Sequence, residues 1–576
     1  MLKRTTESLG LRPSTSGYGT LLTSDNDRGA HASMTPSSSM PSLAESSQTL
    51  QVIPHKGKDA SETLVEPIMD CKYTDLGSIS MNLLMLCMCV MTALPSIDGS
   101  ILFIIQSTVA SQFKSAHLVA WLHASYILGT CLTQPLAGCL ADIYGRQPLL
   151  LLATTMFMVG SFICGAARSM VQLVMSRFLA GLGGGFVMTL TSIVVQDVVP
   201  RHLRGLYQSR LKMTQMGGIA LGAPLGGFIT DYFGWRNCFY INILPCLFVL
   251  MISFRLKNYT HVGKIQPNAI EKLKQIDFAG AILISTSTAS LVTAMVMCGN
   301  LRPWTDPVII GLLSICFASL AAFILHEWYL PEDSKCRALM PRRLISERNV
   351  LCSCFLNCFT AVENFAYLFL YPQFYMGARD ITASTAGALT TTRVLGTITG
   401  AFIIGRYLRK HDYYNIMVLS AIGGVLTNIA IYFSSTMTMP IPVYMVPNTL
   451  DTFSLNGLLS VGSMISLTSY IPNTDNARAI SMQFVFRGNG QVLGSTIAAS
   501  IFQHALKTTL TKNIHTPNAP ELVEFIRTSI AQIHTLPPEL QKIAREAILT
   551  SFKQGLSVPM ISAICCFLAA VFLRRK

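Results

Sequence analysis

The chain has 576 residues, of which 51% are hydrophobic and 12% are charged, and its mean hydropathy is +0.46. Soluble globular proteins carry about 25% charged residues, so this composition excludes an ordinary soluble protein, and it also excludes collagen-like and disordered chains. The formal net charge of +14 would suit a nucleic-acid-binding protein. The basic residues, however, lie in short segments between long apolar ones, so we expect no nucleic-acid partner.

Residues 1–77 precede the first long apolar segment. They are rich in Ser, Thr, Pro and Gly and show no sustained apolar period. Such a segment buries too little surface to offset the entropy lost on ordering it. We therefore predict a disordered tail, which the topology below places in the cytosol.

Fourteen apolar segments follow, each close to the length that crosses a bilayer as a helix. They lie at approximately 79–107, 117–139, 148–167, 170–194, 212–232, 237–255, 277–297, 308–328, 350–374, 385–405, 414–433, 442–471, 479–505 and 556–573. The sequence therefore predicts an all-α, multi-pass membrane protein with fourteen spans.

The basic residues indicate how these spans are oriented. With the N-terminus in the cytosol, about 22 Lys and Arg residues fall in short inner loops and at the C-terminus, against about 5 in short outer loops, as the excess of positive charge on cytoplasmic loops requires. The inner set includes Arg201, Arg204, Arg210, Lys212, Arg342, Arg343, Arg348, Arg406, Arg409 and Lys410. Both termini are thus predicted to be cytosolic, and the segment from about 506 to 555 is predicted to be a mostly polar loop, with short surface helices, on the outer or luminal face.

Six ionisable residues fall within the predicted spans. They are Asp98, Arg177, Glu363, Arg393, Asp451 and Arg487. A charged side chain at membrane depth costs several kcal/mol, so each of the six is a candidate functional residue. The structural alternative is an internal ion pair with no role in transport.

Asp98 interrupts the first span and is the most informative of these residues. Burial in an apolar bundle favours the protonated form of a carboxyl group, whereas a nearby arginine such as Arg177 favours the ionised form. A carboxyl group between these influences can bind a proton on one side of the membrane and release it on the other. The ionised form would also hold a cationic substrate, so proton and substrate would compete, which is the physical basis of antiport.

A run of glycines marks the fifth span. Gly218, Gly222, Gly226 and Gly227 fall on closely related faces of one helix, with Pro224 between them. Small residues at this spacing allow another helix backbone to approach closely, and proline bends a helix. The sequence therefore predicts a close helix–helix contact along this span.

The loop after the second span carries a motif that resembles a known family. The segment "GCLADIYGRQP" resembles the signature between spans two and three of the major facilitator superfamily, with Gly138, Asp142, Gly145 and Arg146 at the matching positions. The resemblance implies a turn and a charge relay that latches two halves of the protein together on the cytosolic side.

Other motifs support the same resemblance in the expected order. "RFLAGLGGG" from Arg177 resembles the fourth-span arginine motif, and "GxxxGAPLGG" from Gly218 resembles the fifth-span motif of the antiporter branch. Asp98 matches the first-span acid of the fourteen-span drug:proton antiporter branch, although "IDGSILFIIQS" departs from that branch's usual sequence. The resemblance covers nearly the whole chain from the first span to the last.

The resemblance implies an architecture and a way of working. Two six-helix halves, residues 78–258 and 350–576, would surround a central site, and an extra helix pair would lie in the linker 259–349. Transporters of this kind bind substrate near the midplane of the membrane and expose it alternately to either side by rocking one half against the other. We expect a monomer that needs no cofactor and no metal ion.

Within this branch the chain resembles fungal vacuolar basic amino acid transporters. The resemblance rests on "VVQDVVPRHLRGLYQS", on "FRGNGQVLGSTIAASIFQHAL" and on the long loop ending in "SFKQG". It implies proton-coupled antiport of lysine, arginine or histidine from the cytosol into the vacuole, with Asp98 and Arg177 coupling the proton. Asp98, Glu363 and Asp451 would suit a cationic substrate, and Arg487 or Arg177 would meet its α-carboxylate.

Two alternatives remain open at the level of sequence. The same fold could export drugs or siderophores at the plasma membrane, and a transporter fold could act as a nutrient sensor that signals through its tail. The chain lacks the G-x-x-x-x-G-K-[ST] phosphate loop of ATP-driven pumps and the HExxH and GxSxG motifs of hydrolases. We therefore expect a secondary transporter and not an enzyme.

Overall fold

The computed structural model describes residues 80–113, 118–256, 274–297, 304–330, 336–381, 383–514, 519–528 and 536–574, together with residues 272 and 533. The predicted tail, residues 1–77, lies outside the described residues. The secondary structure in these ranges is helical apart from one isolated bridge between Ile276 and Arg337. The all-α prediction is confirmed.

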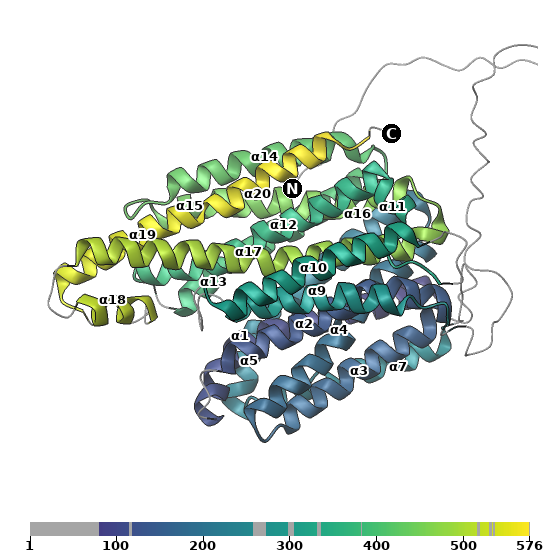
Figure 1. Cartoon of the computed structure of the whole chain (residues 1–576), viewed down its shortest axis with the longest axis horizontal. Coiled ribbons are helices and arrows are strands. Elements are labelled where there is room, and N and C mark those ends of the chain that lie inside the picture. The colour runs from purple at the N-terminus through teal and green to yellow at the C-terminus, as the bar shows by residue number, and fades with distance from the viewer. Residues whose placement is uncertain are drawn as a thin grey trace, which may run out of the picture. The chain divides into compact units, whose positions relative to one another are not determined.

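A first set of helices comprises α1 to α7 and is drawn in purple and blue in Figure 1. The bounds are α1 Met81–Phe113, α2 Val119–Tyr144, α3 Arg146–Ala166, α4 Met170–Val198, α5 Arg204–Phe233, α6 Asn237–Tyr240 and α7 Ile243–Arg255. Helix α1 packs on α5, and α4 packs on both α2 and α3. The glycine run of α4 makes this possible, because a Cβ at Gly181 would meet the backbone of α2 and a Cβ at Gly183 would meet the backbone of α3.

A second set, teal to yellow in Figure 1, comprises α12 to α20. The bounds are α12 Arg348–Gln373, α13 Ala383–Tyr407, α14 Tyr413–Ser434, α15 Ile441–Asp451, α16 Ser460–Ser469, α17 Asn476–Asn513, α18 Ala519–Thr528, α19 Pro538–Gly555 and α20 Ser557–Val571. Two π-helical segments, η3 Phe374–Ala378 and η4 Thr452–Leu459, continue α12 and connect α15 to α16. Helix α12 packs on α17 and α20, while α5 with α13 and α2 with α17 join the two sets.

Helices α9 (Phe278–Met297) and α10 (Pro307–Tyr329) form an additional pair. They pack on each other, and α9 contacts both α2 and α17. Local sequence explains where α10 begins: Asp306 accepts a hydrogen bond from the backbone N–H of Val308, and Pro307 occupies the first helical position. The pair therefore contacts one helix from each set.

Fewer helices meet a criterion of length and apolar composition for a membrane span than the fourteen that the sequence predicted. Ten helical segments of the described residues are long and apolar enough to cross a membrane. Helices also occupy the other predicted positions, namely α2, α5, α15 with α16, and α17, but they fall outside that criterion. The protein is a multi-pass membrane protein, and the count of fourteen stays a prediction.

The segment 506–555 differs from the polar loop that we predicted. Helix α17 continues to Asn513, and α19 packs along α17 and η3 instead of lying loosely on the surface. Helix α19 buries four apolar side chains at helical spacing, which are Ala544, Ala547, Ile548 and Phe552. The Phe552 ring lies 4.6 Å from that of Phe374. Charged and polar residues occupy the other face of α19 and hid this apolar stripe in the sequence.

Candidate functional site

The structure brings Asp98 and Arg177 together, as the sequence predicted. Asp98 on α1 forms an ion pair with Arg177 on α4, and each residue is 1% exposed. Asn242 donates through Nδ2 to the other carboxylate oxygen of Asp98 at 3.1 Å. The Arg177 guanidinium also lies 4.4 Å from the centre of the Tyr126 ring. One carboxylate and one guanidinium thus form a neutral, buried pair inside the first set of helices.

The glycines of α5 hold this helix against α1 beside Asp98. A Cβ at Gly222 would lie 2.8 Å from the carbonyl oxygen of Ile97, and one at Gly218 would lie 2.9 Å from that of Ala93. Gly226 faces α1 in the same way, but Gly227 has nothing within 4 Å of a Cβ, and Pro224 is exposed. The prediction that Gly227 shares this face is wrong, because one residue along a helix is a rotation of about 100°.

The motif after the second span forms a buried charge cluster. Arg146 lies 3.0 Å from a carboxylate oxygen of Asp142 and 3.0 Å from one of Asp197. Gly145 has a φ of +91°, which favours glycine, so the chain turns sharply between α2 and α3. Arg478 at the start of α17 lies 3.7 Å from Asp142. The cluster therefore reaches from the first set of helices to the second.

Gly138 sets the separation of the two sets at this end. A Cβ at Gly138 would collide with the carbonyl group of Ala477 on α17. We expect Gly138→Val to force α2 and α17 apart at a cost of about 1–3 kcal/mol, which shifts a two-state balance by about 5- to 150-fold towards the open arrangement. The neighbouring Cys139 is 1% exposed, so its rate of maleimide labelling, followed by mass spectrometry, should rise.

The matched control for this prediction is Gly311→Val on α10, where nothing lies within 4 Å of a Cβ. We expect wild-type labelling of Cys139 in that variant. Equal labelling of Cys139 in Gly138→Val and wild type would show that this contact does not hold the end closed.

The second set of helices contains a larger buried cluster. Arg393 on α13 lies 3.5 Å from Oε1 of Glu363 on α12 and 3.6 Å from Oδ2 of Asp451, the last residue of α15. Glu363 and Asp451 are 0% exposed and Arg393 is 9% exposed. The sequence singled out all three by membrane depth, but their association depends on how three helices are rotated and could not be predicted.

Neutral side chains complete this cluster. Asn456 of η4 donates to Oε2 of Glu363 at 3.1 Å, and Asn428 of α14 donates to Oδ1 of Asp451 at 2.8 Å. The Arg393 guanidinium lies 4.7 Å from the centre of the Tyr367 ring and 5.1 Å from that of Tyr371. Sequence reasoning missed these partners, because single amide and phenol residues in an apolar helix resemble ordinary packing residues.

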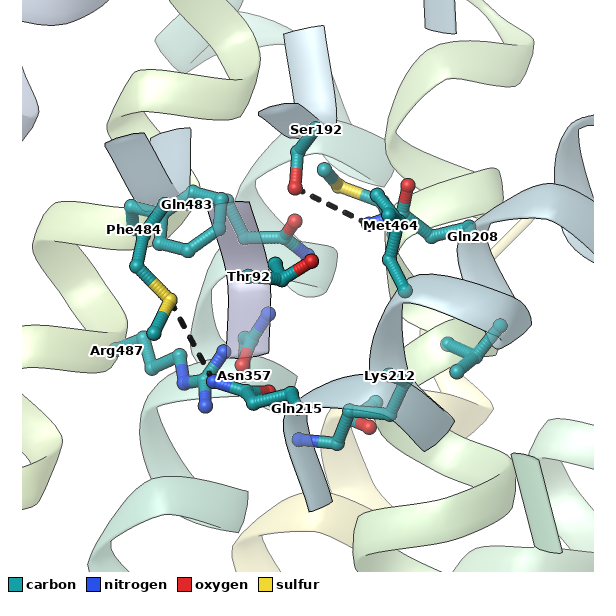
Figure 2. A pocket seen from close by; sticks show the side chains of 14 residues that line it. Thr92, Ser192, Gln208, Lys212, Gln215, Asn357, Met464, Gln483, Phe484 and Arg487 are labelled. Carbon is teal, nitrogen blue, oxygen red and sulfur yellow. Dashed lines mark hydrogen bonds between the residues drawn. The ribbon is translucent and has the colours of Figure 1, made fainter. Parts of the chain in front are cut away.

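A cavity lies where the two sets meet (Figure 2). Its lining residues are Thr92 of α1, Met188 and Ser192 of α4, Gln208, Leu211, Lys212 and Gln215 of α5, Asn357 of α12, Ser460, Val461 and Met464 of α16, and Gln483, Phe484 and Arg487 of α17. The cavity volume is about 50 Å³. Such a volume holds a few water molecules but not an amino acid, so the two sets would have to move apart to admit one.

The charged side chains that line this cavity are basic. Lys212 and Arg487 are the charged members of the lining, and no carboxylate lines the cavity within the described residues. The positive charge of Arg487 lies close enough to Lys212 for the two side chains to repel each other. Figure 2 shows the two side chains at one side of the pocket, without an acidic neighbour between them.

Of the four predicted substrate-binding residues, Arg487 alone lines this cavity. Asp98, Glu363 and Asp451 lie in the ion-paired clusters described above. Lys212 is a residue that the sequence assigned to an inner loop. Helix α5 begins at Arg204, two turns earlier, so Lys212 faces the cavity from inside a helix. Its position at the start of an apolar segment was the available signal.

Comparisons with known proteins agree with this arrangement. The family model described as "Major Facilitator Superfamily" matches residues 86–333, and the solved structure of the proton:xylose symporter XylE covers 85% of this chain, and 94% of its own length, with a TM-score of 0.55 at 14% identity. Residues 86–333 thus match the major facilitator superfamily, and the fold of the chain resembles that of a member of it. The matching family and the relatives described below are membrane transporters and not enzymes.

Several curated fungal relatives span most of the chain. The Schizosaccharomyces pombe "Vacuolar membrane amino acid uptake transporter fnx2" is 29% identical, with 84% of this chain and 82% of the relative covered. The S. pombe "Multidrug resistance protein fnx1" is 28% identical, with 82% and 89% covered. The Saccharomyces cerevisiae "Vacuolar basic amino acid transporter 2" is 27% identical, with 68% and 84% covered. The resemblance to vacuolar amino acid transporters is thus confirmed at the level of relatives.

Proposed function

We propose that this chain is a proton-coupled antiporter that moves amino acids, and basic amino acids among them, from the cytosol into the vacuole. The observation that carries the proposal is the pair of cations, Lys212 and Arg487, in a cavity between the two sets of helices. Two like charges in a confined site repel, and a carboxylate between them would remove that repulsion and form charge-assisted hydrogen bonds. Every amino acid supplies this group as its α-carboxylate.

The remaining lining suits the rest of an amino acid. Gln208, Gln215, Gln483 and Asn357 present amide oxygens, which accept hydrogen bonds from an ammonium group without a formal charge. The geometry therefore supports a carboxylate-bearing substrate. The preference for a basic side chain, and the vacuolar membrane as the location, rest on the relatives named for those properties.

Alternating access would use the contact between Gly138 and α17 as its gate. In the proposed orientation, with both termini in the cytosol, the cluster of Asp142, Arg146 and Arg478 lies at the cytosolic end and is closed. Substrate would load when this cluster parts, and the two sets would then rock to release it into the vacuole.

The proposal is tested by uptake into vacuolar vesicles from cells with and without this chain. We expect ATP-dependent uptake of labelled lysine, arginine or histidine that requires the chain and collapses with a protonophore. Labelled leucine and glutamate should be measured in parallel, because a cationic cavity also admits them on charge grounds. If the chain is present in the vesicles and none of the five is taken up, amino acid transport is excluded. Uptake of glutamate alone would move the substrate class to acidic amino acids.

A second candidate, drug export, follows from the relative named for multidrug resistance. It predicts a chain at the plasma membrane whose deletion sensitises cells to toxic compounds, with unchanged vacuolar amino acid pools. The positive cavity makes anionic or neutral compounds the better drug substrates on charge grounds.

A further inference from the structure

Two buried clusters, one around Asp98 and one around Arg393, differ in charge balance, whereas in the gate cluster two carboxylates meet the two guanidinium groups of Arg146 and Arg478. In the first set, one carboxylate, Asp98, faces one guanidinium, Arg177. In the second set, two carboxylates, Glu363 and Asp451, face one guanidinium, Arg393. With every group ionised the first cluster is neutral, whereas the second carries one uncompensated negative charge. An uncompensated charge without access to water is expensive, so the second cluster favours binding one cation.

The hydrogen bonds show where that cation would bind. Oε2 of Glu363 and Oδ1 of Asp451 accept hydrogen bonds from Asn456, Asn428 and Thr427. The other two oxygens, Oε1 of Glu363 and Oδ2 of Asp451, have no hydrogen-bond donor among the described residues. Both face Arg393, and the two carboxyl groups lie within hydrogen-bonding reach of each other. A proton on one of these oxygens can therefore be donated to the other carboxyl group.

We propose that Glu363 and Asp451 hold the proton that this transporter exchanges for its substrate, and that the Asp98–Arg177 pair has a structural role. The inference rests on the proton coupling proposed above and deepens it. One O–H bond forms on Glu363 or Asp451 when a proton arrives from the vacuolar side, and the same bond breaks when the proton leaves to the cytosol. No other group changes, and the site carries one proton per cycle.

The groups that face the pair do not supply a competing proton carrier. Arg393 comes from α13, Tyr367 and Tyr371 from α12, Tyr444 from α15 and Cys566 from α20. Arg393 stays cationic, and phenol and thiol groups give up their protons only under alkaline conditions in water. The two aromatic rings beside Arg393 also hold its guanidinium when a carboxylate is neutralised.

The same two helical segments carry the proton pair and line the central cavity. Asn357 lines the cavity and Glu363 follows it on α12 by six residues, about 9 Å along the helix. Asn456, which holds Glu363, also accepts through its backbone carbonyl a hydrogen bond from the hydroxyl of Ser460, a cavity residue. The π-helical segment η4 lies between Asp451 and Ser460, and such segments mark functional sites more often than ordinary helix does. Residues of the proton pair and residues of the cavity wall therefore lie on the same helical segments.

The variants Glu363→Gln and Asp451→Asn test proton binding separately from substrate exchange. Each substitution leaves one carboxylate opposite Arg393, so the cluster becomes neutral without a proton. Purified protein in proteoliposomes should still exchange labelled lysine for internal lysine in the absence of a gradient. Accumulation of labelled lysine driven by a proton gradient should fall to the level without a gradient. Glu327→Gln is the matched control, because Glu327 is a buried carboxyl group of α10, 2% exposed, outside both sites.

A second measurement is independent of any substrate. Infrared difference spectra of the purified protein at vacuolar and at cytosolic pH should show a carboxylic acid C=O band in wild type and in Glu327→Gln. The band should be absent from both Glu363→Gln and Asp451→Asn. Gradient-driven accumulation of lysine in either variant, or an unchanged carboxylic acid band in both, would overturn the inference. Lysine exchange by the wild-type protein would in that case still support the proposed function. If wild type does not exchange lysine, the proposed function fails and the spectra alone decide the inference.

Discussion

Asp98→Asn is expected to destabilise the protein by about 3–5 kcal/mol, because it leaves Arg177 buried without its carboxylate. Arg177 is 1% exposed and remains charged at any physiological pH. The amide that replaces the carboxylate keeps the shape of the site but not its charge. The measurement is thermal denaturation of the purified protein in lipid nanodiscs, with protein abundance in membranes as a second readout.

The pairing itself is tested by a double variant. Asp98→Asn with Arg177→Gln removes both charges and should recover most of the lost stability, since neither partner is left unpaired. Asp380→Asn is the matched control: Asp380 pairs with Arg545 at 2.7 Å, but its side chain is 50% exposed, and exposed pairs contribute about 0–1 kcal/mol. A double variant as unstable as the sum of its singles would contradict the account of Asp98 and Arg177 as one neutral unit.

Arg487→Gln is expected to raise the KM for amino acid uptake by about 10- to 150-fold, which corresponds to the loss of one charged hydrogen bond worth about 1.5–3 kcal/mol. Lys212→Met should have an effect of similar size. Stability should not fall in either variant, because each removes one of two like charges that repel in the cavity. The measurement is the concentration dependence of uptake together with thermal denaturation.

Decarboxylated analogues show which end of the substrate these cations bind. Cadaverine and agmatine keep the basic groups of lysine and arginine but lack the α-carboxylate. We expect them to compete poorly with lysine in wild type, and the difference between lysine and cadaverine should shrink in Arg487→Gln. Equal competition by lysine and cadaverine in wild type would show that Lys212 and Arg487 do not bind a carboxylate.

The sequence predicted those features that depend on composition along a single helix. Apolar segments placed the helices, and membrane depth selected the six ionisable residues Asp98, Arg177, Glu363, Arg393, Asp451 and Arg487. The motif around Gly145 indicated the turn that its positive φ confirms. Each of these signals is local, so it survives without knowledge of neighbouring helices.

Features that depend on helix rotation could not be predicted. Arg393 meets two carboxylates only because α12, α13 and α15 are each rotated so that Glu363, Arg393 and Asp451 face one another. Lys212 lines the cavity because α5 extends beyond its apolar segment. The assignment of Asp98, Glu363 and Asp451 to the substrate site stays a prediction. In the structure these acidic residues lie opposite arginines of their own helix sets.

The length of helix α17 offers a way to observe the transport cycle. Its 38 residues extend over about 57 Å, well beyond the roughly 30 Å hydrocarbon thickness of a bilayer. Helix α19 packs along α17 and also against η3, where the Phe552 ring stacks on that of Phe374. All these contacts belong to the second helix set, so this assembly moves with that set as a lever arm. A small tilt at the gate becomes a larger displacement at the tip, where a fluorophore on α18 would report each turnover.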